Sequence, residues 1–255
     1  MFADSPRFRS SPIADLRRLV GRLDGIDAGH HRTRLAFEVP AIDQRLGGGL
    51  AAWALHEAAG ETPAPGDEAA ATAFVAGLAA RLGTAPVLWA GRQRDLHAPG
   101  IAQLGLHPDR LIRVEARDDA DVLAAMEEAL RHGGLSAVVG EIARGGMTAT
   151  RRLQLAAEAR NVTALLLRRH RAGGSAPFAE PSVAFSRWCL AAMPSTPLSV
   201  DGVGCPRWRL TLVRQRGGES DAWIVEGCDA TGRIALAADA GDRTDRSRIA
   251  GRHAA

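Results

Sequence analysis

The residues whose types and spacing come nearest to a chemical motif form one turn, Gly60-Glu61-Thr62-Pro63-Ala64-Pro65-Gly66-Asp67-Glu68. A phosphate loop reads G-x-x-x-x-G-K-[ST], because free amides and a helix N-terminus hold oxyanions, Lys adds positive charge and the hydroxyl binds magnesium. Here Asp67 and Glu68 stand where the Lys and the hydroxyl residue belong, and the loop is one residue longer. Pro63 and Pro65 remove two amide donors. The turn therefore predicts a degenerate phosphate loop that binds no cofactor.

The composition excludes several classes of enzyme. The chain of 255 residues contains no lysine, so all 32 basic residues are arginines, against 29 acids and a net charge of +3. Walker A ATPases, Schiff-base enzymes and Ser-Lys hydrolases each need a lysine side chain that is absent here. A coding bias toward Arg and Ala accounts for the basic pI near 9.3, which therefore gives only weak support for nucleic-acid binding.

The sequence offers no metal site or other familiar catalytic motif. His56-Glu57 begins an H-E-x-x-H pattern, but Gly60 occupies the second histidine position. His30-His31 has no ligand residues at metal-binding spacing nearby, so a solvated pair is favoured. The three cysteines lack C-x-x-C spacing and are expected to be buried thiols: Cys189, Cys205 and Cys228. We therefore expect neither a zinc module nor a disulfide framework.

Apolar strands alternate with helical patterns along most of the chain. Strands are expected at 53–58, 87–90, 111–114, 136–139 and 163–167, and helices at 67–82, 120–131 and 150–160. Three further strands, at 188–192, 208–215 and 222–226, include an antiparallel hairpin at the sheet edge. Strands buried on both faces predict an α/β fold, in which a mainly parallel central sheet is flanked by helices.

The two ends of the chain differ from this core of residues 35–237. Residues 1–34 predict an N-terminal amphipathic helix and a linker; the helix either packs on its own core or docks on a partner. Residues 238–255 are polar enough to predict a disordered tail. No apolar run long enough for a membrane span or an export signal is present, which favours a cytoplasmic protein.

The run Val39-Pro40-Ala41-Ile42-Asp43-Gln44-Arg45-Leu46-Gly47-Gly48-Gly49-Leu50, followed by a strand and the degenerate turn, resembles the recombinase core of the RecA superfamily. The order of the later elements matches too, and the resemblance covers about residues 35–237. It implies a RecA-like fold whose catalytic positions are lost. By that alignment Arg92 replaces the glutamate that activates water, and Gly140 replaces the magnesium-associated aspartate that ends the third strand. Glu141 beside it is a remaining acid.

A RecA-like core with an inverted phosphate loop, an N-terminal helix and a short C-terminal hairpin resembles the ImuA family of inducible-mutagenesis proteins. The resemblance implies a non-catalytic accessory protein of SOS-induced, error-prone translesion synthesis. Its implied partners are ImuB, a polymerase-like protein without catalytic residues, and an error-prone DnaE-type polymerase. Two alternatives stay open: a modulator of RecA filaments, and a divergent nucleotide hydrolase or switch that uses Arg92 and Glu141 in altered roles.

A basic segment is the candidate for contact with single-stranded DNA. Arg168, Arg169 and Arg171 leave the fourth core strand just before a Gly-rich loop, where RecA-like proteins carry a DNA-contacting loop. Three aromatic residues are available for base stacking: Phe178, Phe185 and Trp188. The alternative is that the arginines end a strand and the aromatic residues pack the core.

Candidate partner-interface residues lie in two places. The apolar stripe of the N-terminal helix supplies Leu16, Leu19 and Leu23, and the C-terminal hairpin supplies Trp208 and Trp223. Cross-strand packing explains the two tryptophans equally well.

Overall fold

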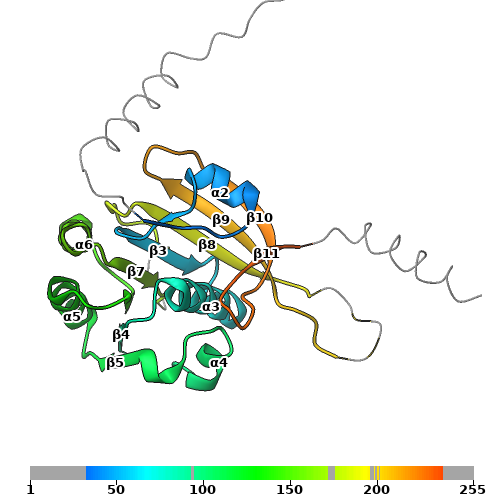
Figure 1. The fold of residues 1–255 in the computed structure, drawn as a ribbon, viewed down its shortest axis with the longest axis horizontal. Helices are drawn as coiled ribbons and strands as arrows, with labels where there is room; N and C mark the ends of the chain where they lie inside the picture. The colour runs from blue at the N-terminus through cyan, green and yellow to red at the C-terminus, as the bar shows by residue number, and fades with distance from the viewer. Residues whose placement is uncertain are drawn as a thin grey trace, which may run out of the picture.

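The computed structural model describes residues 33–92, 95–171, 176–195, 198, 200 and 202–237 (Figure 1). The predicted N-terminal helix with Leu16, Leu19 and Leu23, and the predicted tail at 238–255, lie outside these residues. The described structure is thus that of the predicted core.

The core contains one nine-stranded sheet with the order β11-β10-β9-β8-β3-β7-β6-β4-β5. Its strands are β3 (Leu55–Gly60), β4 (Val87–Gly91), β5 (Leu111–Glu115), β6 (Ala137–Ile142), β7 (Thr163–Arg168), β8 (Ser186–Met193), β9 (Arg207–Gln215), β10 (Asp221–Glu226) and β11 (Ala235–Leu236). Strands β3 to β8 pair in parallel, and β9, β10 and β11 extend the sheet in antiparallel fashion from β8. The predicted mainly parallel sheet with an antiparallel edge hairpin is confirmed.

Helices cover both faces of the parallel part of the sheet (Figure 1). Helix α3 (Pro65–Arg81) packs on one face, and α5 (Asp119–His132) and α6 (Met147–Arg160) pack on the other. Successive strand side chains therefore enter two different cores. Val139 packs on the α3 side, whereas Val138 packs on the α5 side. This double burial explains why the strands read as continuous apolar runs.

Sequence patterns missed helix α2 (Pro40–Leu46), which lies within the run that carried the RecA resemblance. Pro40 starts the helix, and Gly47 ends it with φ of 68°, a left-handed conformation that suits glycine. The remaining short elements are β1 (Arg34–Leu35), β2 (Leu50–Ala51), α4 (Ala98–Ala102) and a 3₁₀ turn (Pro108–Arg110). Strands β1 and β2 form a separate two-stranded antiparallel sheet.

A buried carboxylate joins the three central strands. Glu57 on β3 is fully buried, and its Oε1 accepts hydrogen bonds from Arg168 Nη2 at 2.6 Å and Nε at 3.2 Å. Its Oε2 accepts a hydrogen bond from Arg187 Nε on β8 at 2.7 Å. The neighbouring His56 lies between Ser186 Oγ and Ala51 O, and burial lowers its pKa to about 4, so it stays neutral near pH 7. The side-chain nitrogens of His56 and oxygens of Glu57 are thus all engaged with other groups of the chain.

Replacing Glu57 with Gln should destabilise the fold strongly, because the change keeps the side-chain volume but leaves two guanidinium groups without their buried counter-charge. We expect a loss of about 3–5 kcal/mol in the free energy of unfolding, measured by urea titration. The matched control is Glu128→Gln on the exposed face of α5, which should change stability by less than about 0.5 kcal/mol. Equal losses in the two variants would contradict this account.

Candidate functional site

The degenerate turn lies between β3 and α3, beyond the carboxyl end of the central strand. In an open parallel sheet this is the edge at which ligands bind. The turn approaches its own helix closely: a Cβ atom on Gly60 would lie 2.9 Å from the carbonyl carbon of Asp67, so only glycine fits there. The turn is shorter than the sequence predicts, because Gly60 is the last residue of β3 and Gly66 already lies in the first turn of α3.

The carboxylate of Asp67 occupies amide donors that an anion would otherwise use. Its Oδ2 accepts hydrogen bonds from Thr62 N at 3.0 Å and Thr62 Oγ1 at 2.6 Å, and its Oδ1 accepts one from Ala192 N at 2.7 Å. Burial acts to raise the pKa of Asp67, but these hydrogen bonds outweigh it and hold the pKa below its usual value. The turn thus carries its own anion.

A second carboxylate, that of Glu68, starts a chain of ion pairs. Glu68 Oε2 lies 2.9 Å from Arg169 Nη1, and the other side of the same guanidinium donates to Glu141 Oε2 from Nε at 3.0 Å and Nη2 at 2.9 Å. Trp89 Nε1 donates to the other oxygen of Glu141. Burial acts to lower the pKa of Arg169, but the two carboxylates hold it above its ordinary value. We call Glu68, Arg169 and Glu141 the acid–arginine chain.

His170 connects the acid–arginine chain to the turn through two hydrogen bonds. Its backbone N donates to Glu68 Oε1 at 3.0 Å, and its Nε2 lies 2.9 Å from Gly60 O. Helix α3 is thereby tied through Glu68 to the residues that follow β7.

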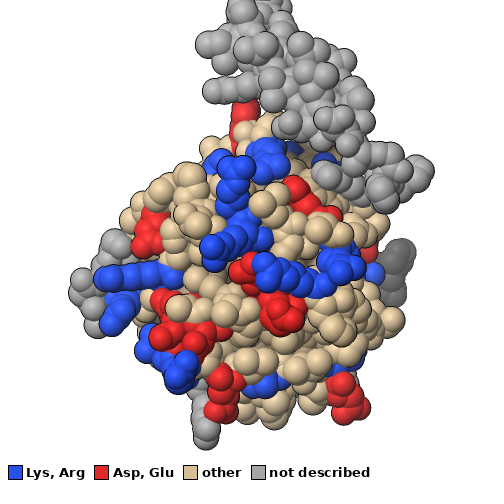
Figure 2. Space-filling model, turned by 90° about the vertical axis from the view of Figure 1, so that its left-hand side faces the viewer, with Lys and Arg blue, Asp and Glu red and all other residues tan. Residues whose placement is uncertain are grey.

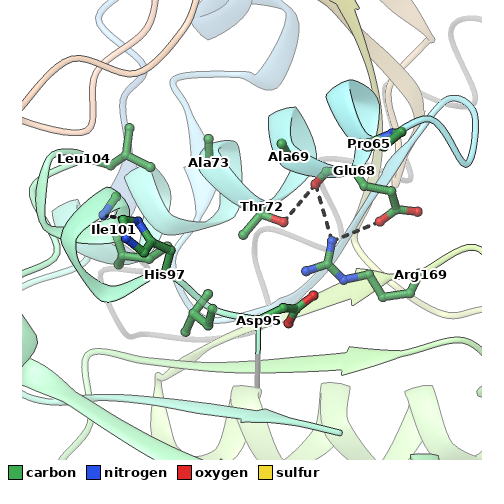
Figure 3. A pocket seen from close by; sticks show the side chains of 12 residues that line it. Pro65, Glu68, Ala69, Thr72, Ala73, Asp95, His97, Ile101, Leu104 and Arg169 are labelled. Atoms are coloured by element: carbon green, nitrogen blue, oxygen red, sulfur yellow. Dashed lines mark hydrogen bonds and ion pairs between the residues drawn. The ribbon is translucent and has the colours of Figure 1, made fainter. Parts of the chain in front are cut away.

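Two cavities meet at the acid–arginine chain. One of about 410 Å³ lies between α3 and α4, and its apolar wall is formed by Ala69, Ala73, Leu96, Ile101 and Leu104. The other, of about 1070 Å³, lies at the carboxyl ends of β4, β6 and β7. Glu68, Asp95 and Arg169 line both cavities. Figure 3 shows the smaller one, where Glu68 and Arg169 close one end of the apolar wall.

Two more acids cap backbone amides near this edge. Asp119 Oδ2 accepts hydrogen bonds from Ala143 N at 3.2 Å and Arg144 N at 2.9 Å, and Glu180 Oε2 accepts one from Gly145 N at 2.9 Å. Amides that could bind a phosphate are thus satisfied by the chain's own carboxylates.

The structure corrects the assignment of Gly140 as the lost magnesium position. Strand β6 does not end there but continues to Ile142. A side chain at Gly140 would run into Met126 of α5, on the face opposite the turn. Glu141 points to the turn side instead and is the acid that faces it. Arg92 is about half exposed, and its Nη1 lies 3.8 Å from Asp119 Oδ1.

The three arginines predicted to contact nucleic acid are placed very differently. Arg168 is 1% exposed, so its expected surface position is wrong, because its side chain lies over the neighbouring strand β3 and pairs with the buried Glu57. Arg169 belongs to the acid–arginine chain, and only Arg171 is exposed. Trp188 and Phe185 are buried, which corrects their proposed stacking role.

The hairpin tryptophans also serve the core. Trp208 is 4% exposed and Trp223 is partly buried against the same cluster, with its ring 6.5 Å from that of Trp188. Core packing therefore replaces the interface role for Trp208. Within the described ranges, no group of three or more His, Cys, Asp or Glu residues could hold a metal ion. No described helix is both long and apolar enough to cross a membrane.

Comparison with known proteins identifies the family. The chain is 43% identical over 206 residues to the protein named ImuA from two strains of Caulobacter vibrioides, NA1000/CB15N and ATCC 19089/CB15. The match covers 77% of this chain and 84% of each relative. The chain belongs to the ImuA family. No protein-family model matches it.

The fold of this ImuA-family chain is RecA-like. A crystal structure of the RadB recombinase superposes with a TM-score of 0.53 at 16% sequence identity, covering 80% of this chain and all of that one. An identity this low supports the shared fold alone. The expectation of a RecA-like sheet is confirmed.

No sequence pattern indicates the residues that pair with the carboxylates of the site. No sequence motif singles out Thr62 or Trp89. The sequence signal for Thr62 is its place in the loop, five residues before an acid in the first turn of a helix to which it can donate hydrogen bonds. Trp89 and Asp119 carry no such local signal, because their partners come from distant elements.

Replacing Asp67 with Asn should show a pH-dependent loss of stability, because an amide accepts fewer hydrogen bonds than a carboxylate. At pH 7 we expect a loss of about 1–3 kcal/mol in the free energy of unfolding. The pKa of Asp67 is lowered in the folded state, so its contribution is complete above its unfolded value near ~4 and is lost as the pH falls through the folded value. Urea titrations at several pH values should show the deficit shrinking in acid. Asp109→Asn, at an exposed position, is the control, and a pH-independent deficit would contradict the assignment.

Proposed function

We propose that this chain is a non-catalytic accessory protein of SOS-induced, error-prone translesion DNA synthesis. The observation that carries the non-catalytic part is the acid–arginine chain, which fills the place where a RecA-like ATPase needs positive charge and a metal ion. Membership of the ImuA family supports the mutagenesis role.

The electrostatics of the turn oppose nucleotide hydrolysis. Phosphoryl transfer depends on cations placed around the phosphates. Here Asp67, Glu68 and Glu141 supply three carboxylates, and the guanidinium of Arg169 is already shared between Glu68 and Glu141. A triphosphate entering this edge would meet like charge and would have to displace hydrogen bonds that stabilise the fold. The divergent-hydrolase alternative is therefore disfavoured.

The proposed role is that of an adaptor that associates with an ImuB-type polymerase-like protein and an error-prone DnaE-type polymerase. The RecA-like scaffold supports this role because the carboxylates at its ligand edge are paired within the chain, whereas Met147 and Leu155 on α6 are exposed in the part of the chain that the structure describes. RecA is a further candidate partner. Contact with single-stranded DNA is supported by one observation. Arg92, Arg117 and Arg171 are exposed and line the larger cavity.

Isothermal titration of the full chain with Mg-ATP should give no binding heat, because the turn presents carboxylates where phosphates would lie. A hydrolysis assay under the same conditions should match the buffer blank, with a lysine-containing RecA-like ATPase as the positive control. Micromolar binding together with hydrolysis above the blank would refute the non-catalytic role and restore the hydrolase alternative.

Deleting the gene should lower the frequency of ultraviolet-induced mutants to that of undamaged cells, and growth without damage should stay normal. Expressing the wild-type chain from a plasmid should restore mutagenesis. If induced mutagenesis persists in the deletion strain, the chain has no accessory role in error-prone synthesis.

A further inference from the structure

The outward face of α6 combines exposed apolar and basic side chains. Met147 is 49% exposed and Leu155 is 55% exposed. Met147, Arg151, Leu155 and Ala159 follow one another at intervals of four residues and so form a single stripe along the helix. Arg152 is exposed beside this stripe. Arg151 lies between Met147 and Leu155 in this stripe, so exposed apolar and basic side chains alternate along the helix.

The arginines of α6 are unpaired within the described part of the chain. No hydrogen bond or ion pair joins the side chains of Arg151, Arg152 or Arg160 to any other residue in the described part of the chain. The one acid of the helix, Glu158, already accepts a hydrogen bond from Gln154 at 2.8 Å. The first turn of α6 contains no acid to complement the helix dipole.

The neighbouring helix α5 has the opposite arrangement. Its last turn has an internal pair, Arg131 with Glu127, and Asp121 in its first turn pairs with Arg117 just before the helix. Two of the acids of α5 thus pair with arginines close by, whereas Arg151, Arg152 and Arg160 of α6 pair with no described residue.

The basic surface continues from α6 onto the end of β9. Arg216 Nη1 lies 3.9 Å from Glu158 Oε1, and Arg214 Nη1 donates to Ser182 O at 2.7 Å. The next residue, Val183, donates its amide to Thr150 Oγ1 of α6. In Figure 2, which looks onto the side of α5 and α6, Arg side chains run from the upper part of the face to its centre.

We propose that this surface, which we call the α6 face, docks an acidic amphipathic helix of a partner protein. Apolar side chains of that helix would pack on Met147 and Leu155, and its carboxylates would pair with Arg151 and Arg152. Arginine suits this role because its planar guanidinium binds a carboxylate through two parallel hydrogen bonds.

Charge complementarity favours this occupant over nucleic acid. A phosphate backbone would use the arginines but not the apolar stripe. Base stacking needs exposed aromatic rings, and Phe185, the ring beneath Arg216, is 9% exposed and covered by that guanidinium. The proposal rests on the α6 face alone and does not depend on the role in mutagenesis.

The test uses the full-length chain and a synthetic, fluorescently labelled helical peptide of about 18 residues, with Leu at four-residue spacing flanked by Glu. A scrambled peptide of the same composition is the comparison, and binding is followed by anisotropy. We expect the amphipathic peptide to bind at least about tenfold more tightly than the scrambled one. The double variant Arg151→Glu/Arg152→Glu should lose this binding and should prefer a peptide in which Arg replaces each Glu.

Two single variants distinguish docking on the α6 face from a general effect of changing a surface residue. Leu155→Ser should weaken peptide binding by about tenfold, whereas Arg131→Glu on α5 should leave it unchanged. Circular dichroism melts should confirm that each variant is folded, and Arg151→Ala/Arg152→Ala replaces the charge reversal if that variant is not. Equal binding of the two peptides would overturn the proposal. It would also be overturned if the arginine variant lost single-stranded DNA binding that Leu155→Ser retained, or if it converted a dimer of this chain into a monomer.

Discussion

Pairing between buried carboxylates and two consecutive arginines at the end of β7 is the interaction on which the rest of the structure depends. Strand geometry sends adjacent side chains to opposite faces of a sheet. Arg168 therefore reaches Glu57 on the α6 side, and Arg169 reaches Glu68 and Glu141 on the α3 side. One dipeptide thus holds together the central strands, helix α3 and the degenerate turn. If a charged side chain were removed from either face of the sheet, the buried group that it pairs with would keep its charge without a partner.

Much of the sheet could be predicted from sequence because its strands are buried on both faces. The pattern places β4 at 87–90, and the structure extends it by one residue to Gly91. Helix α6 begins three residues before its predicted start at 150, because Met147 and Thr148 are exposed and add no apolar periodicity. Helix α2 was missed because its seven residues are too few to show a helical period, although Pro40 and Gly47 mark its ends.

The sequence shows that the turn lacks the lysine and the hydroxyl residue of a phosphate loop. It does not show which residues pair with the two acids that stand there. Asp67 and Glu68 show at once that the turn is no ordinary phosphate loop. Their partners come from elements more than 100 residues away, such as Ala192 and Arg169, and no local pattern reports such pairing. The error at Gly140 has a simple geometric origin. A displacement of one residue along a strand moves a side chain to the other face of the sheet, so Glu141 faces the turn.

The carboxylate of Asp67, held by the amides of Thr62 and Ala192, also bears on how such a protein is controlled. RecA-like ATPases can use the bound nucleotide as a timer, since hydrolysis changes the charge at the loop and with it the affinity for neighbours. A loop that supplies its own permanent anion has one charge state at neutral pH. Under the proposed role, the concentration of the protein in the cell would then determine when and for how long the assembly forms, and nucleotide hydrolysis by the protein would not.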